Sequence, residues 1–156
     1  SMGTRIDVLQ PMYSLVKRQA EVEILPMAAA ERIAVAPYSP LGSGLLTGKY
    51  LAGGTGRLST DKRYAARYGQ NWMRDTAQAF SRLAEEFGHN AATLAVAWVA
   101  HNPAVTAPII SARNTEQLAP SLKALVISLS AGEYAQIERL SHRPAPATDR
   151  LEEATS

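Results

Sequence analysis

The sequence predicts an α/β fold built on a parallel sheet. Three short stretches, 6–12, 33–36 and 107–110, carry the apolar residues typical of buried strands, and each is followed by a helical pattern. Because parallel strands must be joined by a crossover, this alternation favours βα units with right-handed connections. We therefore expect about three parallel βα units plus extra helices, with any ligand at the carboxyl ends of the strands.

The first helical pattern covers 17–30 and places apolar side chains at Val22, Leu25 and Met27. Proline lacks a backbone N–H and its ring clashes with the preceding turn of a helix. This helix is therefore expected to be interrupted, or to end, near Pro26.

A polar stretch at 52–70 follows the second predicted strand and contains the run Gly53-Gly54-Thr55-Gly56-Arg57. Closely spaced glycines leave the backbone with wide conformational freedom. We expect this stretch to be mobile.

The second half of the chain predicts two helices in succession. Apolar residues recur at three- and four-residue spacing over 71–87, and Gly88 is placed to end an amphipathic helix there. The stretch 91–100 is apolar on nearly every side, as in a buried helix, and Pro103 follows its expected end.

Two further helices and a tail complete the predicted organisation. The first spans 115–125, and Ser130 with Glu133 resembles a capping box that starts a last short helix. We expect residues 1–141 to form one domain and residues 142–156, which are rich in proline, alanine and charge, to be a disordered tail.

The composition is that of a globular protein, with 46% hydrophobic and 19% charged residues among 156. A net charge of +2 without a basic stripe argues against nucleic acid and anionic membrane surfaces as partners. The absence of cysteine excludes disulfides and thiolate zinc sites and suits a reducing compartment. No apolar run reaches the length of about 20 residues that spans a bilayer, so we expect a cytoplasmic protein.

The segment that follows the second predicted strand has the chemistry of an anion-binding turn. Its prolines exclude a helix at its start, and its glycines allow backbone N–H groups to approach a ligand closely. A phosphate is the natural ligand for such a turn, and a plain solvated loop is the alternative. The segment reads Ala36-Pro37-Tyr38-Ser39-Pro40-Leu41-Gly42-Ser43-Gly44-Leu45-Leu46-Thr47-Gly48-Lys49-Tyr50.

This segment resembles the one after the seventh barrel strand of aldo-keto reductases, which grips the pyrophosphate of NADP(H). Residues 8–18, Val-Leu-Gln-Pro-Met-Tyr-Ser-Leu-Val-Lys-Arg, resemble the sixth strand of that family and its turn. Residues 106–118, Thr-Ala-Pro-Ile-Ile-Ser-Ala-Arg-Asn-Thr-Glu-Gln-Leu, resemble the eighth strand and the start of its helix. The three motifs keep the family's order and spacing over residues 6–141.

The resemblance implies a partial TIM barrel, namely the carboxyl-terminal part of a (β/α)8 barrel from about the sixth strand onward. A complete barrel needs about 250 residues, which is more than this chain provides. Three parallel strands cannot close a barrel, so apolar side chains on one face of the sheet are expected to meet water.

The resemblance also implies roles for residues at the mouth of the barrel. Gln10 corresponds to the glutamine that hydrogen-bonds the nicotinamide carboxamide, and Tyr38 to the aromatic residue that stacks on the nicotinamide ring. Their structural alternatives are a polar contact to a neighbour and core packing. The residues implied to line the pyrophosphate are Ser39, Pro40, Leu41, Gly42, Ser43, Gly44 and Leu45, with Thr47 and Lys49 as weaker candidates.

The third motif bears on the choice of cofactor. Ser111 and Arg113 offer a hydroxyl and a guanidinium that suit the 2′-phosphate of NADP, so we expect NADP in preference to NAD. Asn114 is expected to cap the following helix. Gln117 matches a family position that supports the 2′-phosphate end, whereas Ser121 belongs to a Pro-Ser pair that departs from the Glu-Asn commonly holding the adenine.

No residue of this chain inherits the family's catalytic aspartate, tyrosine, lysine or histidine, which the resemblance places on the first four strands. The chain alone is therefore expected to be inactive. We expect either a truncated reductase that needs a complementing amino-terminal half-barrel, or a self-assembling, non-catalytic cofactor-binding or scaffold module. A weaker third interpretation is an enzyme with new catalytic groups, suggested by Asp61, Arg63, Tyr64 and Tyr68.

Overall fold

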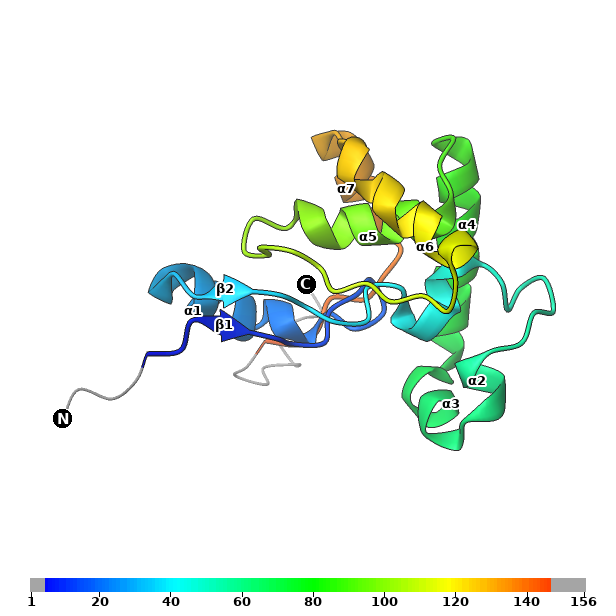
Figure 1. The fold of residues 1–156 in the computed structure, drawn as a ribbon, viewed down its shortest axis with the longest axis horizontal. Coiled ribbons are helices and arrows are strands. Elements are labelled where there is room, and N and C mark those ends of the chain that lie inside the picture. The colour runs from blue at the N-terminus through cyan, green and yellow to red at the C-terminus, as the bar shows by residue number, and fades with distance from the viewer. Residues whose placement is uncertain (1–4, 147–156) are drawn as a thin grey trace, which may run out of the picture.

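A computed structural model describes residues 5–146 of the chain and combines a small parallel sheet with helices that leave part of the sheet open (Figure 1). Strands β1 (Val8–Leu9) and β2 (Ala34–Val35) pair in parallel, with Val8 opposite Ala34 and Leu9 opposite Val35. The prediction of a mixed α/β fold with a parallel sheet is confirmed.

Both strands are shorter than the predicted ranges 6–12 and 33–36, because prolines interrupt the ladder. Pro11 and Pro37 carry no N–H and cannot donate to a neighbouring strand. Beyond them the pairing resumes only as an isolated parallel bridge between Met12 and Tyr38.

The third predicted strand, 107–110, is also reduced to an isolated bridge, between Tyr38 and Ile109. The N–H groups of Thr106 and Ala107 both point to the carbonyl of Val35, at 2.8 and 3.3 Å, and Pro108 has no N–H to offer. This segment therefore follows β2 without forming a regular strand.

The first helical region consists of a 3₁₀ turn, η1 (Gln19–Glu21), and helix α1 (Ile24–Glu31). The prediction that this helix would be interrupted or end near Pro26 is wrong. Pro26 lies in the first turn of α1, where a backbone N–H has no acceptor within the helix, so its missing donor costs nothing.

The stretch predicted to be mobile contains two short helices, α2 (Arg57–Thr60) and α3 (Lys62–Tyr68). The Asp61 side chain accepts a hydrogen bond of 2.9 Å from the backbone N–H of Arg63 and so caps α3. Tyr68 is fully buried and anchors α3 to the rest of the protein.

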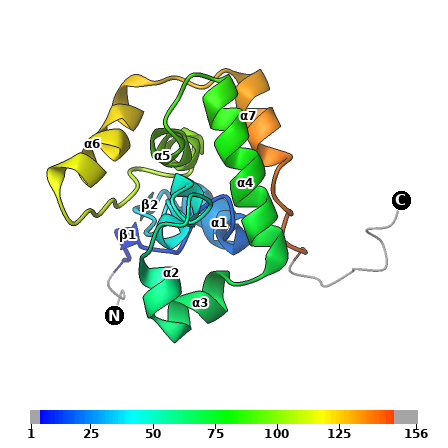
Figure 2. The same ribbon diagram turned by 90° about the vertical axis from the view of Figure 1, so that its right-hand side faces the viewer.

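Two long helices, α4 (Asn71–Glu86) and α5 (Ala91–His101), follow as predicted. Gly88, with φ of 71°, lies just after α4, and Asn90 caps α5 through its side chain. Figure 2 shows α5 in the middle of the molecule, with α6 on one side and α4 and α7 on the other. Trp98 of α5 is fully buried, which explains the apolar character of that helix.

The remaining helices are α6 (Thr115–Leu122), a 3₁₀ extension η3 (Lys123–Val126) and α7 (Ala131–Glu138). The capping box predicted at Ser130 and Glu133 is present at the start of α7. Residues 142–146 form no helix or strand, whereas residues 147–156 of the predicted tail lie outside the described part. Within residues 5–146, no helix combines the length and apolar character that crossing a bilayer requires.

Candidate functional site

Tyr38 joins the three motifs at the carboxyl end of the sheet. Its N–H donates to the carbonyl of Pro11 at 2.9 Å, and its carbonyl accepts from the N–H of Tyr13 at 3.2 Å. On its other side it forms the parallel bridge to Ile109. The three segments that sequence analysis singled out therefore meet at one residue.

One face of this sheet is uncovered. Val8 of β1 and Gln10, one residue beyond its end, are exposed and lie two positions apart, so an extended backbone directs their side chains to the same face. The parallel register carries this face to Tyr38, which lies opposite Met12, and Tyr38 and Ile109 are 38% and 39% exposed. The two residues expected to meet a nicotinamide, Gln10 and Tyr38, thus share an open face.

The loop after Tyr38 contains the 3₁₀ segment η2 (Gly42–Thr47) and has an unusual backbone. Positive φ values occur at Ser39 (60°), Gly42 (55°), Ser43 (57°) and Gly44 (88°). Serine pays a steric cost in this region, and such strained residues cluster at ligand sites. Leu41, with φ of −87°, has a right-handed backbone conformation, and Gly42 after it has a left-handed one. Successive N–H groups in such a pair point to one side and form a concave site for an anion.

Two glycines of this loop have close neighbours. A Cβ at Gly42 would lie 3.0 Å from Cγ2 of Val16, and a Cβ at Gly44 would lie 2.9 Å from Cε of Lys49. Lys49 lies along the loop with its ammonium 4.8 Å from the centre of the Tyr50 ring. The loop is therefore closely surrounded, with a basic side chain at its edge.

The Ser43 hydroxyl is buried and has no hydrogen-bond partner among residues 5–146. It lies near the hydroxyl of Tyr68, which donates to Sδ of Met12 at 3.6 Å. Burial raises the pKa of Tyr68. A buried hydroxyl without a partner is available to a ligand or a water molecule.

Other residues of the predicted set stabilise the loop itself. The Thr47 hydroxyl donates to the carbonyl of Gly44 at 2.8 Å. Pro40 and Leu45 are buried, and the Leu45 side chain packs in the core. The side chains of these two residues are therefore not available to a ligand.

The third motif forms the amino terminus of α6. Asn114 caps this helix, as predicted, because its side chain accepts from the N–H of Gln117 at 2.9 Å. The Gln117 side chain in turn accepts from the N–H of Arg113 at 3.3 Å. Ser111, Arg113 and Gln117 are exposed, whereas Ser121 is buried.

Arg113 lies four residues beyond the bridge at Ile109, so its Cα is within about 15 Å of that residue. Within the described part of the chain, its guanidinium makes no ion pair. The structure thus brings the first two motifs together at one end of the sheet, and the third motif follows Ile109 into the start of α6.

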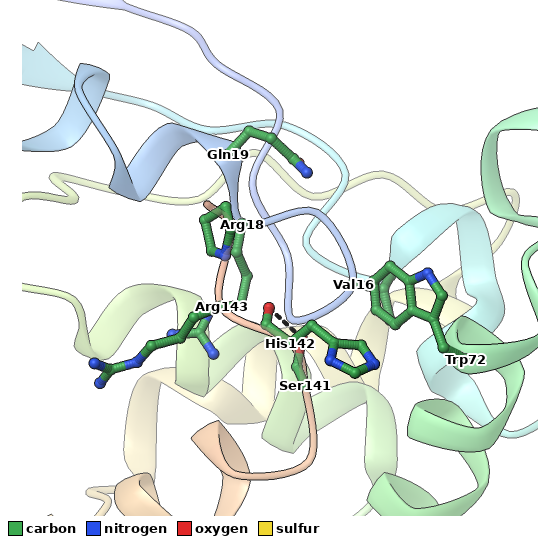
Figure 3. Close-up of a pocket in the computed structure, with 8 residues that line it drawn as sticks. Val16, Arg18, Gln19, Trp72, Ser141, His142 and Arg143 are labelled. Atoms are coloured by element: carbon green, nitrogen blue, oxygen red, sulfur yellow. Dashed lines mark hydrogen bonds between the residues drawn. The ribbon is translucent and has the colours of Figure 1, made fainter. Parts of the chain in front are cut away.

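Two concave depressions of the protein lie away from these residues. One of about 180 Å³ is where His142 meets Trp72 edge to face (Figure 3). The other, of about 290 Å³, lies between Leu25 of α1 and Tyr134 of α7. Residues 5–146 contain no group of three or more side chains that could hold a metal ion.

Sequence reasoning missed the support beneath the loop. The Tyr68 ring approaches Gly42, and Nζ of Lys17 lies 5.7 Å from the centre of that ring. Burial and the charge of Arg67 lower the pKa of Lys17. The signal available in the sequence was the helical spacing of Tyr64 and Tyr68 within the stretch predicted to be mobile.

The family model described as "Aldo/keto reductase family" matches residues 1–142. The chain belongs to this family. The uncharacterized oxidoreductase YrpG of Bacillus subtilis is 41% identical over 120 residues, which cover 77% of this chain and 36% of that protein. A probable voltage-gated potassium channel subunit beta of Oryza sativa is 34% identical over 139 residues, covering 80% and 42%.

A third relative, the NADH-specific methylglyoxal reductase of Escherichia coli, is 31% identical over 129 residues, covering 80% of this chain and 39% of that protein. The chain thus spans about two fifths of the length of these relatives. Aldo/keto reductases generally use NADH or NADPH as cofactor.

Proposed function

We propose that this chain carries the NADP(H)-binding part of a carbonyl-reducing aldo/keto reductase, and that its sheet is the carboxyl-terminal portion of a (β/α)8 barrel. The left-handed loop at Ser39–Gly44 is the observation that carries the proposal. It includes the buried Ser43 hydroxyl, which has no partner among residues 5–146, and follows Tyr38, which shares an open face of the sheet with Gln10.

The residues present fit a dinucleotide. The alternation at Leu41 and Gly42 suits a pyrophosphate, Lys49 supplies a positive charge beside the loop, and Gln10 and Tyr38 offer an amide and an aromatic face. A bound nicotinamide would supply hydride to a carbonyl substrate. This chain's own residues would bind the cofactor and fix which face of its ring is open.

Arg113 supports NADP over NAD. Its guanidinium is exposed near the amino terminus of α6, where the Gln117 side chain accepts from the backbone N–H of Arg113, and a guanidinium suits the 2′-phosphate that only NADP carries. The Escherichia coli relative that is specific for NADH makes this preference a point to test.

Fluorescence titration of the chain with NADPH and with NADH tests both the binding of a dinucleotide and the preference for NADP. We expect tighter binding of NADPH and a loss of that preference in Arg113→Ala. Arg32→Ala is the control, because Arg32 lies just before β2, at the opposite end of the sheet. Equal affinities for the two cofactors would end the NADP assignment, and binding of neither would end the cofactor-holding proposal.

The chain alone should not reduce a carbonyl, since we assign its proton-donating groups to strands outside it. Mixing it with an amino-terminal half-barrel of a relative should produce NADPH-dependent reductase activity that neither half has alone. Absence of activity in a mixture that forms a stable complex would contradict this pairing.

A second candidate function is a self-assembling, non-catalytic module, favoured by exposed apolar side chains. Ile6 and Val8 are each 55% exposed, and Leu125 and Val126 of η3 are each 84% exposed. Such surfaces mark contacts with other polypeptides. Sedimentation equilibrium should then reveal a defined homo-oligomer, whereas a monodisperse monomer at micromolar concentration would rule this function out.

A further inference from the structure

Positive charge gathers around α2 and α3, although the sequence as a whole gave no basic stripe. We call the side chains of Lys17, Arg57, Lys62, Arg63 and Arg67 the basic surface. The one acidic residue between 57 and 68 is Asp61. With 16 basic and 14 acidic residues in the chain, the basic surface and Asp61 together carry +4, and the rest carries −2.

Few of these charges are neutralised. Asp61 pairs with Arg63 at 3.1 Å, and in the part of the chain that the structure describes no carboxylate forms an ion pair with the other four. Arg57 and Arg67 lie 5.6 and 5.7 Å from the centre of the same Tyr64 ring. Aromatic rings hold cations in place without cancelling their charge.

The basic surface also repels itself. The charge of Arg67, after burial, is a cause of the lowered pKa of Lys17. An approaching anion reduces the repulsion between like charges that the fold holds close together.

The basic surface adjoins the loop of the candidate site. The Tyr68 ring lies 3.7 Å from where a Cβ of Gly42 would be, which joins α3 to the loop. The Tyr50 hydroxyl accepts from the N–H of Leu58 at 3.3 Å and so joins α2 to the residues after the loop. Figure 2 shows α2 and α3 together on the side of the molecule to which this loop leads.

We propose that the basic surface steers the anionic dinucleotide to the loop, with Lys62 and Arg67 accelerating association without contacting the bound cofactor. This inference rests on the proposed function. Fields from clustered charges raise association rates by about tenfold or more, and charges at the rim of a site alter association more than dissociation. Residues that contact the ligand would instead change the dissociation rate.

Stopped-flow fluorescence with NADPH tests the steering. In the double variant Lys62→Glu/Arg67→Glu, we expect association at low salt to slow by about tenfold, with dissociation changed less than twofold. The difference should vanish near 1 M salt, where the screening length is about 3 Å. Arg32→Glu is the control with the same change in sign and should slow association less than twofold.

A changed dissociation rate, or an equal slowing in Arg32→Glu, would overturn the steering role. Circular dichroism of each variant confirms that the fold is kept. If the double variant unfolds, Lys62→Gln alone should still slow association about twofold at low salt, and unchanged association in it would also overturn the proposal.

Failure of the parent chain to bind NADPH would remove the proposed function, and inorganic pyrophosphate then tests the basic surface alone. We expect pyrophosphate to shift the NMR signals of Arg57 and Arg67 side chains in the parent and in Arg32→Glu, and the Arg57 signals far less in the double variant. No shift in the parent would overturn the basic surface as an anion-binding element.

Discussion

Nη2 of Arg18 lies 2.7 Å from Oε1 of Glu138, a contact between residues 120 positions apart. Arg18 also donates from Nε to Glu21 at 2.8 Å, and its side chain is only 2% exposed. The two carboxylates are 21% and 23% exposed, so all three charges are largely withdrawn from water. One guanidinium therefore fixes the segment after β1 to the end of α7.

Arg18→Met is expected to lower the free energy of unfolding by about 3 kcal/mol, because it leaves partly buried Glu21 without a counter-charge and Glu138 with only the exposed Arg143. Denaturant titration measures this loss. Arg143→Met is the matched control: Arg143 is 79% exposed and lies 3.8 Å from Glu138, so its loss should cost less than about 0.5 kcal/mol. Equal effects of the two substitutions would show that the Arg18 network contributes no more than a surface pair.

Substitutions at Gly42 and Gly53 distinguish the cost of backbone strain from the cost of steric crowding. Both glycines have positive φ, 55° and 75°, but their surroundings differ. A Cβ at Gly53 meets nothing within 4 Å, so Gly53→Ala should cost about 1 kcal/mol from strain alone. Gly42→Ala adds a contact with Val16 at 3.0 Å and should cost about 1–3 kcal/mol more. Thermal unfolding of both variants measures the difference, and equal costs would mean that the loop moves aside.

The helices could be predicted where the sequence pattern that indicates them lies within one continuous segment. The apolar spacing over 71–87, the all-round apolar character of 91–100 and the Ser130–Glu133 capping box gave α4, α5 and the start of α7. The strands were not bounded correctly, because their length depends on which N–H groups a neighbouring segment can use. Pro11 and Pro108 remove donors at positions that only the pairing reveals.

The candidate site was predictable as a set of residues but not as a surface. The resemblance pointed to Gln10, Tyr38 and Arg113, yet nothing local to these residues reveals that Ser121 is buried while they are exposed. Tyr68 was missed as support because its neighbours Met12, Lys17 and Gly42 lie 26 or more positions earlier in the sequence. Long-range packing overrides local composition in such cases.

Tyr134 should make the protein less stable at high pH. Burial, followed by the charges of Glu138 and Glu21, raises the pKa of Tyr134 to about 12 from an ordinary value of 10.0. The folded state therefore keeps its proton while the unfolded state loses it, so this contribution is complete below pH 10 and is lost as the pH rises to about 12.

The free energy of unfolding, measured by denaturant titration from pH 9 to 12, should fall in the parent as the pH rises. In Tyr134→Phe the fall of this free energy with pH should be less steep, by up to about 1.4 kcal/mol per pH unit. Tyr13 reinforces the effect, since burial and then the hydrogen bond to Glu21 raise its pKa too. Parallel slopes in the parent and in Tyr134→Phe would show that Tyr134 does not hold its proton in the folded state.

Substitution of Ser43 is expected to change the stability of the fold and the affinity for NADPH in opposite directions. Its φ of 57° is strained for serine, and its buried hydroxyl has no partner among the described residues. Ser43→Gly removes both the backbone strain and the unpaired hydroxyl. With the greater chain entropy of glycine in the unfolded state subtracted, it should raise the free energy of unfolding by about 1 kcal/mol.

Ser43→Gly also removes a donor for pyrophosphate and should weaken NADPH binding by about tenfold. Ser43→Ala keeps the strain and loses the hydroxyl, so it should weaken binding as much while gaining less stability. Weaker stability in Ser43→Gly would mean that the hydroxyl is already satisfied, and unchanged affinity in both variants would remove Ser43 from the site.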